Sequence, residues 1–185
     1  MKVKKMPEVI LLCGFSGSGK TETGKILAKN IGYGFTDTDE AVEEILGRPI
    51  PEIFAQMGES EFRSAESDAL RAAVMRKPQI ISLGGGSIDD ENNLEYIKRN
   101  GCLVYLKTTP ETVHKRLRDS HVRPMLQSFG LSDGERATLS LERICSLMEK
   151  REKYYLQADI VIDTEGRMPD EAAREIKSRL IQDGP

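Results

Sequence analysis

A glycine-rich motif directly after a short apolar run limits what this chain can fold into more than any other feature. Residues 14–21, GFSGSGKT, match GxxxxGK[ST] without a gap, and the apolar residues 9–13 precede them. Such a run, ending at glycine, is typical of a strand buried on both faces of a parallel sheet. The glycines allow backbone angles that aim successive N–H groups at phosphate oxygens, and the following helix adds its positive N-terminal end. The motif therefore predicts a phosphate-binding loop between a strand and a helix.

The residue types within this loop indicate a nucleoside triphosphate. Lys20 supplies a point charge between the β- and γ-phosphates, and the Thr21 hydroxyl is a ligand for Mg²⁺. The motif does not distinguish ATP from GTP, and it leaves the phosphate acceptor open. We expect nucleotide contacts from Gly17, Ser18, Gly19, Lys20, Thr21 and Glu22.

Strands and helices alternate along the rest of the chain. Further apolar runs occupy residues 79–83, 102–106 and 160–162, and a weaker run ends at 34–37. Apolar residues at helical spacing fill the intervals, and Asp39 is the expected N-cap of a helix over 40–46. Such alternation requires crossover connections, so it predicts an α/β fold with five parallel strands and helices on both faces. The expected helices are 20–30, 40–46, 61–74, 94–99, 110–118, 135–155 and 169–181.

Length, charge and cysteine usage restrict the class of protein. A chain of 185 residues is about one domain long, so we expect 1–185 to be a single domain. The 27 basic and 30 acidic residues leave a net charge of −3, which gives no general attraction to nucleic acid. No apolar run approaches the ~20 residues of a membrane span, so we expect no membrane association. The 3 cysteines are odd in number and far apart, which argues against a disulfide framework and favours the cytoplasm.

Residues 120–134 form a long polar stretch without periodicity. The stretch contains Arg123, and a loop of this length in a compact domain is usually functional or mobile. An arginine on such a loop could close over phosphates, neutralise charge in the transition state and exclude water. A plain connecting loop explains the stretch equally well. On the first interpretation, residues 119–134 are a mobile lid.

Candidate acceptor-binding residues follow the second and third strands. Asp37 and Asp39 lie two residues apart on an extended segment, so both carboxylates face the crevice at the carboxyl ends of the strands. One could help to hold Mg²⁺ and the other could meet a substrate, although a helix cap with a solvated neighbour is an equal alternative. Glycines 84–86 follow the third strand and would let a ligand approach the backbone, but a plain loop is as good an explanation.

Two arginines have ordinary structural explanations when each is taken alone. Arg63 lies on an amphipathic helical pattern, where a surface arginine is the favoured interpretation. Arg151 lies near the end of the helix expected over 135–155, where a basic residue interacts favourably with the helix C-terminus. The order of the motifs along the chain is what suggests a shared function for them.

That order and spacing resemble the shikimate kinase family of small-molecule P-loop kinases. The resemblance runs from Val9 to about Asp163, and its most specific block is GRPIPEIFAQMGESEFR at 47–63. It implies a three-layer P-loop kinase fold in which a five-stranded parallel sheet has the order 2-3-1-4-5, with a mobile lid. The other blocks are GFSGSGKT at 14–21, FTDTD at 35–39, GGG at 84–86, RPML at 123–126 and R-x-x-x-Y at 151–155.

The resemblance also implies a reaction and a role for each motif. The reaction is transfer of the γ-phosphate of ATP to the 3-hydroxyl of shikimate, in the biosynthesis of aromatic amino acids, by a monomer. Arg63 and Arg151 would clamp the shikimate carboxylate, with shikimate-binding helices over about 38–74. The other implied roles are catalysis by Lys20, Asp39 and Arg123, Mg²⁺ binding by Thr21 and Asp37, shikimate contacts from Asp39, Gly84, Gly85 and Gly86, and adenine stacking by Arg116 or Arg118.

Three competing functions can be compared with this one. Gluconate kinases share the loop, but they usually have a His-Pro pair after the D-x-D-like element, and none follows Asp39. Nucleotide kinases would bring a different set of arginines around a second base. A sensing module would keep the pocket and lose Lys20, Asp39 or Arg123, all of which are present. The sequence therefore favours a kinase that acts on shikimate.

Overall fold

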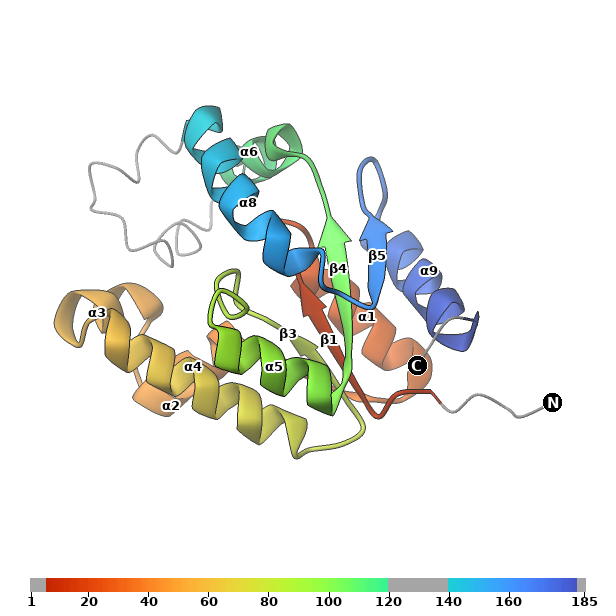
Figure 1. The fold of residues 1–185 in the computed structure, drawn as a ribbon, viewed down its shortest axis with the longest axis horizontal. Coiled ribbons are helices and arrows are strands. Elements are labelled where there is room, and N and C mark those ends of the chain that lie inside the picture. Colours follow the sequence, from red (N-terminus) through yellow and green to blue (C-terminus); the bar gives the residue numbers. More distant parts are fainter. Residues whose placement is uncertain (1–5, 120–139, 183–185) are drawn as a thin grey trace.

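A computed structural model of the chain describes residues 6–119 and 140–182. Within these ranges, five strands form one sheet in the order β2-β3-β1-β4-β5, and all neighbouring strands are parallel (Figure 1). The predicted sheet and the strand order implied by the resemblance are therefore confirmed. The strands are β1 (Val9–Cys13), β2 (Gly34–Asp37), β3 (Gln79–Ser82), β4 (Cys102–Lys107) and β5 (Ile160–Asp163).

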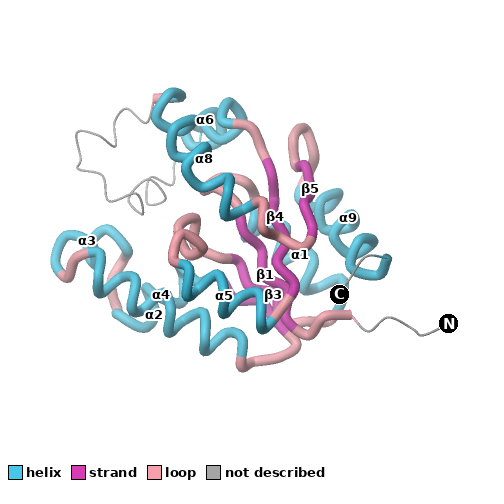
Figure 2. Tube along the Cα trace, viewed as in Figure 1, coloured by secondary structure: helices cyan, strands magenta, loops and turns pink. Residues whose placement is uncertain are grey.

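Helices fill the connections between the strands (Figure 2). One of them, α3, was not predicted from the sequence, because its seven residues are short for a helical period to stand out. No described helix is long and apolar enough to cross a membrane. The candidate lid, Arg123 and the start of the helix expected over 135–155 lie outside the described residues. The described helices are α1 (Lys20–Ile31), α2 (Thr38–Leu46), α3 (Ile50–Gln56), α4 (Glu59–Val74), α5 (Glu91–Asn100), α6 (Pro110–Asp119), α8 (Leu141–Tyr155) and α9 (Pro169–Gln182).

The start of α2 corrects one sequence prediction. We expected Asp39 to cap a helix over 40–46, but α2 begins at Thr38 and its N-cap is Asp37. The Asp37 backbone is extended, and its Oδ1 accepts a hydrogen bond from the Asp39 N–H at 3.0 Å. Because Asp37 already satisfies this unpaired donor of the first turn, the Asp39 side chain is not needed as a cap.

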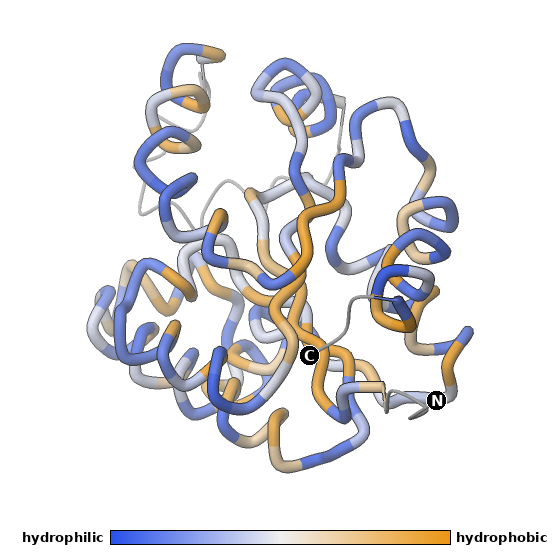
Figure 3. Tube along the Cα trace, turned by 45° about the vertical axis from the view of Figure 1, so that its right-hand side comes forward, coloured by the Kyte–Doolittle hydropathy of each residue, from blue (hydrophilic) through white to orange (hydrophobic). Residues whose placement is uncertain are grey.

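Both faces of the sheet are covered, which gives three layers. Alternate residues of β1 point to opposite faces: Val9 and Leu11 pack in a cluster with α4, α5 and α8, whereas Ile10 and Leu12 pack with α1 and α9. Figure 3 shows the apolar strands at the centre of the molecule, between helices of mixed polarity. Burial on both faces explains why β1 is apolar throughout rather than alternating.

The carboxyl ends of the central strands meet at one edge of the sheet. The phosphate-binding loop follows β1, Asp37 ends β2, and the glycines at 84–86 follow β3. The strand order reverses at β1, which lies between β3 and β4, and open parallel sheets bind ligands at such a point. Helices α2, α3 and α4 share an apolar cluster, and α6 and α8 pack on Phe15 of the loop. The fold therefore places helices on two sides of the crevice.

Candidate active site

The loop after β1 has the backbone shape that its glycines permit. Gly17 and Gly19 have φ angles of +80° and +93°, which residues with side chains rarely adopt. Gly19 is also the N-cap of α1, so the helix N-terminus opens onto the loop. Ser18 Oγ is buried and has no hydrogen-bond partner within the described residues. A phosphate oxygen would satisfy this hydroxyl and the N–H groups around it.

Lys20 is held inside the loop. Its side chain is almost fully buried, and its Nζ donates to the carbonyl oxygens of Gly14 (2.9 Å) and Phe15 (3.1 Å). Burial lowers the pKa of this ammonium, while the carboxylates of Asp37 and Asp39 act in the opposite direction. The positive charge is thus positioned between the loop and the carboxylates that follow β2.

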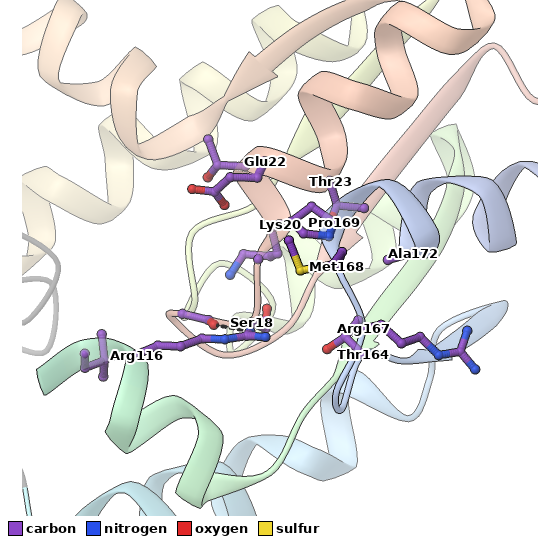
Figure 4. A pocket seen from close by; sticks show the side chains of 14 residues that line it. Ser18, Lys20, Glu22, Thr23, Arg116, Thr164, Arg167, Met168, Pro169 and Ala172 are labelled. Carbon is purple, nitrogen blue, oxygen red and sulfur yellow. Dashed lines mark hydrogen bonds between the residues drawn. The ribbon is translucent and has the colours of Figure 1, made fainter. Parts of the chain in front are cut away.

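A pocket of about 330 Å³ lies beside the loop (Figure 4). Arg116 reaches into it from α6, and its Nη1 donates to the Gly17 carbonyl oxygen at 2.9 Å (Figure 4). Arg118 is exposed and does not line this pocket, so the structure separates the two adenine-stacking candidates by position. All six loop residues predicted to contact a nucleotide line the pocket: Gly17, Ser18, Gly19, Lys20, Thr21 and Glu22.

The opposite wall of this pocket was missed by the sequence analysis. It comes from the β5–α9 connection and the start of α9, and it adds apolar surface next to the phosphate loop. Apolar walls beside a phosphate site suit a nucleotide base, which stacks on such surfaces. From the sequence, Pro169 is expected only to begin the helix over 169–181. No local pattern indicates that a residue at this position faces a distant loop. The wall residues are Thr164, Arg167, Met168, Pro169 and Ala172.

Thr21 and Asp37 form a polar pair that fits a magnesium site. Thr21 Oγ1 donates to Asp37 Oδ2 at 2.7 Å, so a hydroxyl of α1 and a carboxylate of β2 meet beside the loop. Among the residues that the structure describes, no three His, Cys, Asp or Glu side chains gather as a metal cage. Mg²⁺ in phosphate sites takes one or two protein oxygens and completes its shell with water and phosphate. This donor set fits such an ion.

A smaller pocket also adjoins the loop. It is lined by the loop after β1, by α2, α4 and α8, and by the glycines after β3, although these segments are far apart in the sequence. Five of the residues implied to bind shikimate line it: Asp39, Arg63, Gly85, Gly86 and Arg151. Ser16, Phe62 and Glu66 complete the lining.

Two guanidinium groups converge beside Gly86. A β-carbon on Gly86 would lie 3.1 Å from Nη1 and Nη2 of Arg63 and 3.2 Å from Nη2 of Arg151. The missing side chain therefore leaves the space in which both arginines meet. Arginine presents paired N–H donors that match the two oxygens of a carboxylate. The arrangement suits a small anionic ligand.

The Asp39 carboxyl is partly buried beside the glycines that follow β3. Its Oδ1 lies close to Gly84, the first glycine after β3. A β-carbon added to Gly84 would be only 2.5 Å from this oxygen. Burial, together with the Asp37 and Glu66 carboxylates, raises the pKa of Asp39 to about 7, and Lys20 opposes this only in part. A carboxyl with a pKa near neutrality can both accept and release a proton at physiological pH.

Each arginine has an acidic partner that the sequence analysis did not identify. Arg63 Nη1 donates to Oε2 of the buried Glu66 at 2.9 Å, and Arg151 Nε donates to Asp89 Oδ2 at 2.9 Å. Glu66 is three residues after Arg63 on α4, a spacing that brings side chains together and gave a usable signal. Asp89 is 62 positions from Arg151, so no local pattern linked them.

The last turn of α8 is hydrogen-bonded to the glycine segment at 84–86. Tyr155 lies one turn after Arg151, and its hydroxyl donates to the Gly85 carbonyl oxygen at 2.7 Å. Arg151 Cζ lies 5.8 Å from the centre of the Phe15 ring. The four-residue spacing therefore puts an anchor and a guanidinium on the same face of the helix, against the phosphate loop.

The fold and the two pockets beside one phosphate-binding loop define a class: a P-loop kinase of small molecules. A family model described as shikimate kinase matches residues 16–181. The chain is 41% identical to the shikimate kinase of Moorella thermoacetica over 175 residues, 95% of each chain. It is 38% identical to that of Thermodesulfovibrio yellowstonii over 167 residues, 90% of this chain and 91% of the relative.

A solved structure gives the same result. The shikimate kinase of Acinetobacter baumannii, solved in complex with shikimate, matches with a TM-score of 0.82 and 31% identity. The match covers 97% of this chain and 94% of that one. This chain belongs to the shikimate kinase family, a family of ATP-dependent kinases.

Proposed function

We propose that this chain transfers the γ-phosphate of ATP to the 3-hydroxyl of shikimate, giving ADP and 3-phosphoshikimate. The observation that carries the proposal is the meeting of Arg63 and Arg151 beside Gly86, in a pocket shared with Asp39 and Ser16. Two guanidinium groups suit a carboxylate, and the partly buried Asp39 carboxyl suits hydroxyls. The acceptor therefore carries both groups. Membership of the shikimate kinase family supports shikimate among such hydroxy acids.

On the acceptor side, the charged groups fix the orientation of the substrate. The two arginines hold its carboxylate end, and Asp39 accepts a hydrogen bond from a hydroxyl at the other end. The backbone at Gly84, Gly85 and Gly86 lets the ring approach closely. Holding both reactants in line supplies a large part of the rate enhancement in a reaction of this kind.

On the nucleotide side, the loop and its neighbours hold the phosphates. Lys20 exchanges its contacts with two loop carbonyls for the transferring phosphoryl group. Mg²⁺, when bound at Thr21 and Asp37, neutralises charge on the β- and γ-phosphates. Arg116 contacts the nucleotide from α6. The family resemblance gives Arg123, which lies outside the described residues, the role of adding positive charge near the phosphoryl group.

The reaction forms one bond from the acceptor hydroxyl oxygen to the γ-phosphorus and breaks the bond from that phosphorus to the oxygen bridging it to the β-phosphate. The proton of the hydroxyl passes to an Asp39 oxygen. Asp39 must be ionised to accept it, and its pKa of about 7 makes this condition sensitive to pH near neutrality. The transition state is loose, so positioning and charge do most of the work.

The test is release of ADP from Mg²⁺-ATP with shikimate, quinate, gluconate or no acceptor. We expect release only with shikimate, and a new phosphate ester at its 3-hydroxyl in the phosphorus NMR spectrum. ADP release with gluconate and not with shikimate would support a kinase but contradict shikimate as its acceptor. A folded protein that binds ATP and releases no ADP with any acceptor would favour a sensing module.

We also propose a monomer that works in the cytoplasm. One chain supplies the lining of both pockets that the proposed reaction uses. Cys13, Cys102 and Cys145 are all unpaired, as expected of a protein from a reducing compartment. Analytical ultracentrifugation of the active protein would test the oligomeric state.

A further inference from the structure

The two arginines of the acceptor pocket are supported in different ways. Arg63 and its partner Glu66 lie on the same helix, so the geometry of α4 is enough to bring them together. Arg151 lies on α8, and its partner Asp89 lies in the segment between β3 and α5. The contact with Asp89 holds the Arg151 guanidinium from outside α8, and the Phe15 ring lies near it as well. The direction of the guanidinium therefore depends in part on the segment that carries Asp89.

That segment is a well-defined support. The Ser87 N–H donates to the Gly84 carbonyl oxygen at 3.1 Å, and the Asp89 N–H donates to the Gly86 carbonyl oxygen at 3.0 Å. Two successive turns thus connect the glycines of the acceptor pocket to Asp89. Asp90 then caps α5, since its carboxylate accepts from a helix N–H. Asp89 is held between the glycines and a helix end.

The contact uses one specific edge of Arg151. Asp89 Oδ2 accepts from Nε at 2.9 Å, whereas Nη1 and Nη2 lie on the side of the glycines, 3.7 Å and 3.2 Å from where β-carbons on Gly85 and Gly86 would be. A guanidinium is planar, so fixing Nε also fixes the direction of its terminal nitrogens. The terminal nitrogens of Arg151 therefore face Gly85 and Gly86, and the Arg63 guanidinium also lies beside Gly86.

Stability does not explain this pair. Asp89 Oδ1 is buried and has no hydrogen-bond partner within the described part of the chain, so one carboxylate oxygen loses water without compensation. Burial raises the pKa of Asp89 despite the nearby Arg151 guanidinium. A partly buried ion pair with an unsatisfied oxygen is a poor source of folding free energy. A role in holding Arg151 accounts for it better.

We propose that Asp89 is a positioning residue, which accepts the Nε–H of Arg151 and thereby turns Nη1 and Nη2 toward the carboxylate of the acceptor. This inference rests on the proposed function, in which Arg151 binds that carboxylate. Asp89 does not touch the reacting atoms. Its loss should weaken acceptor binding and leave the chemical step and the nucleotide unaffected.

The experiment compares steady-state constants for the parent enzyme, Asp89→Ala and Asp89→Asn. We expect Asp89→Ala to raise KM for shikimate about tenfold, with kcat and KM for ATP within about twofold of the parent. Asp89→Asn should raise KM by only about threefold, because an amide oxygen still accepts the Nε–H. Asp90→Asn is the matched control: it removes an adjacent acidic charge, keeps a good helix cap and should not change KM for shikimate.

Two further measurements separate positioning from general damage. The methyl ester of shikimate lacks the carboxylate charge, so Asp89→Ala should have the same kcat/KM as the parent with the ester. In an Arg151→Ala background, Asp89→Ala should add nothing to the loss of affinity. An equal loss with ester and acid, or full additivity with Arg151→Ala, would overturn the proposal.

The remaining outcomes are also distinguishable. A parent enzyme that releases no ADP with shikimate overturns the proposed function. An active parent with an unchanged or lowered KM in Asp89→Ala overturns the positioning role alone. If Asp89→Ala does not fold, the threefold rise expected for Asp89→Asn, absent in Asp90→Asn, carries the test.

Discussion

The two sides of this active site hold their ligands by different means. On the nucleotide side, one contiguous loop surrounds Lys20, whose ammonium is anchored by carbonyl oxygens of that same loop. On the acceptor side, charged side chains arrive from α2, α4 and α8, and Arg63 and Arg151 each pair with a carboxylate. A backbone cradle depends on local sequence, whereas a cluster of charged side chains depends on the packing of distant elements.

The difference has an energetic consequence. Removal of the Lys20 charge leaves two backbone carbonyls that water can satisfy, and Asp37 and Asp39 lose a nearby positive charge without losing a hydrogen bond to it. A charge removed from the acceptor side leaves its partner buried, as Glu66 would be without Arg63. Substitutions on the nucleotide side should therefore affect catalysis more cleanly, and those on the acceptor side should also change stability.

The largest effect is expected from Lys20→Met on the nucleotide side. The variant keeps an unbranched side chain of similar length and loses the charge on the transferring phosphate, so kcat should fall by about a thousandfold or more. Lys25→Met is the control, because Lys25 is on the same helix, is exposed, and contacts Glu40 and the Phe35 ring rather than the loop. A loss below about tenfold in Lys20→Met would show that the loop lysine does not act on the transferred group.

The contrast also explains what could be predicted from the sequence. The sheet and the phosphate loop were predictable because burial on both faces and a gapless motif are local properties of residues 9–21. The acceptor residues could be proposed only as a set, through the order of their motifs. Glu66 had a usable helical spacing that was not used. No local sequence pattern marks Asp89 or the pocket wall around Met168, because only the folding of distant segments brings them next to the site.

The next largest effect is expected from Asp39→Asn. An amide cannot take the hydroxyl proton, so kcat should fall by about a hundredfold to a thousandfold. In the parent, kcat/KM for shikimate should decline as the pH falls below about 7, as the Asp39 carboxylate becomes protonated. A pH profile that stays flat down to about pH 5 would rule out ionised Asp39 as the base.

The same variant should gain stability. Because the folded-state pKa of Asp39 is raised to about 7, the folded protein binds a proton here more tightly than the unfolded chain does. Stability therefore falls as the pH rises from about 4 to about 7, and Asp39→Asn removes this cost. We expect a gain of at most about 4 kcal/mol in the free energy of unfolding near pH 8, which vanishes toward about pH 4. Urea unfolding at both pH values measures it, and an equal gain at both would contradict the assignment.

Substitution of Arg63 should change KM for shikimate and leave KM for ATP nearly unchanged, which distinguishes the two sides of the site. Arg63→Ala should raise KM for shikimate by about a hundredfold, leave KM for ATP within about twofold and destabilise the fold, because Glu66 loses its partner. Arg63→Lys keeps a positive charge beside Glu66 but lacks the paired donors, so it should be stable and still raise KM about tenfold. The control is Arg99→Ala, an exposed arginine of α5 that pairs with Glu95. Equal changes in both Michaelis constants would show that Arg63 does not belong to the acceptor side.

The smallest effect tests how far the nucleotide side extends beyond the loop. Arg116 lines the nucleotide pocket and donates to the Gly17 carbonyl oxygen, whereas Arg118 is exposed and outside that lining. Arg116→Ala should therefore raise KM for ATP about fivefold, and Arg118→Ala should change it less than about twofold. Neither should alter KM for shikimate. A larger rise in KM for ATP with Arg118→Ala than with Arg116→Ala would mean that α6 turns when nucleotide binds. The nucleotide side would then not be the more rigid side of the site.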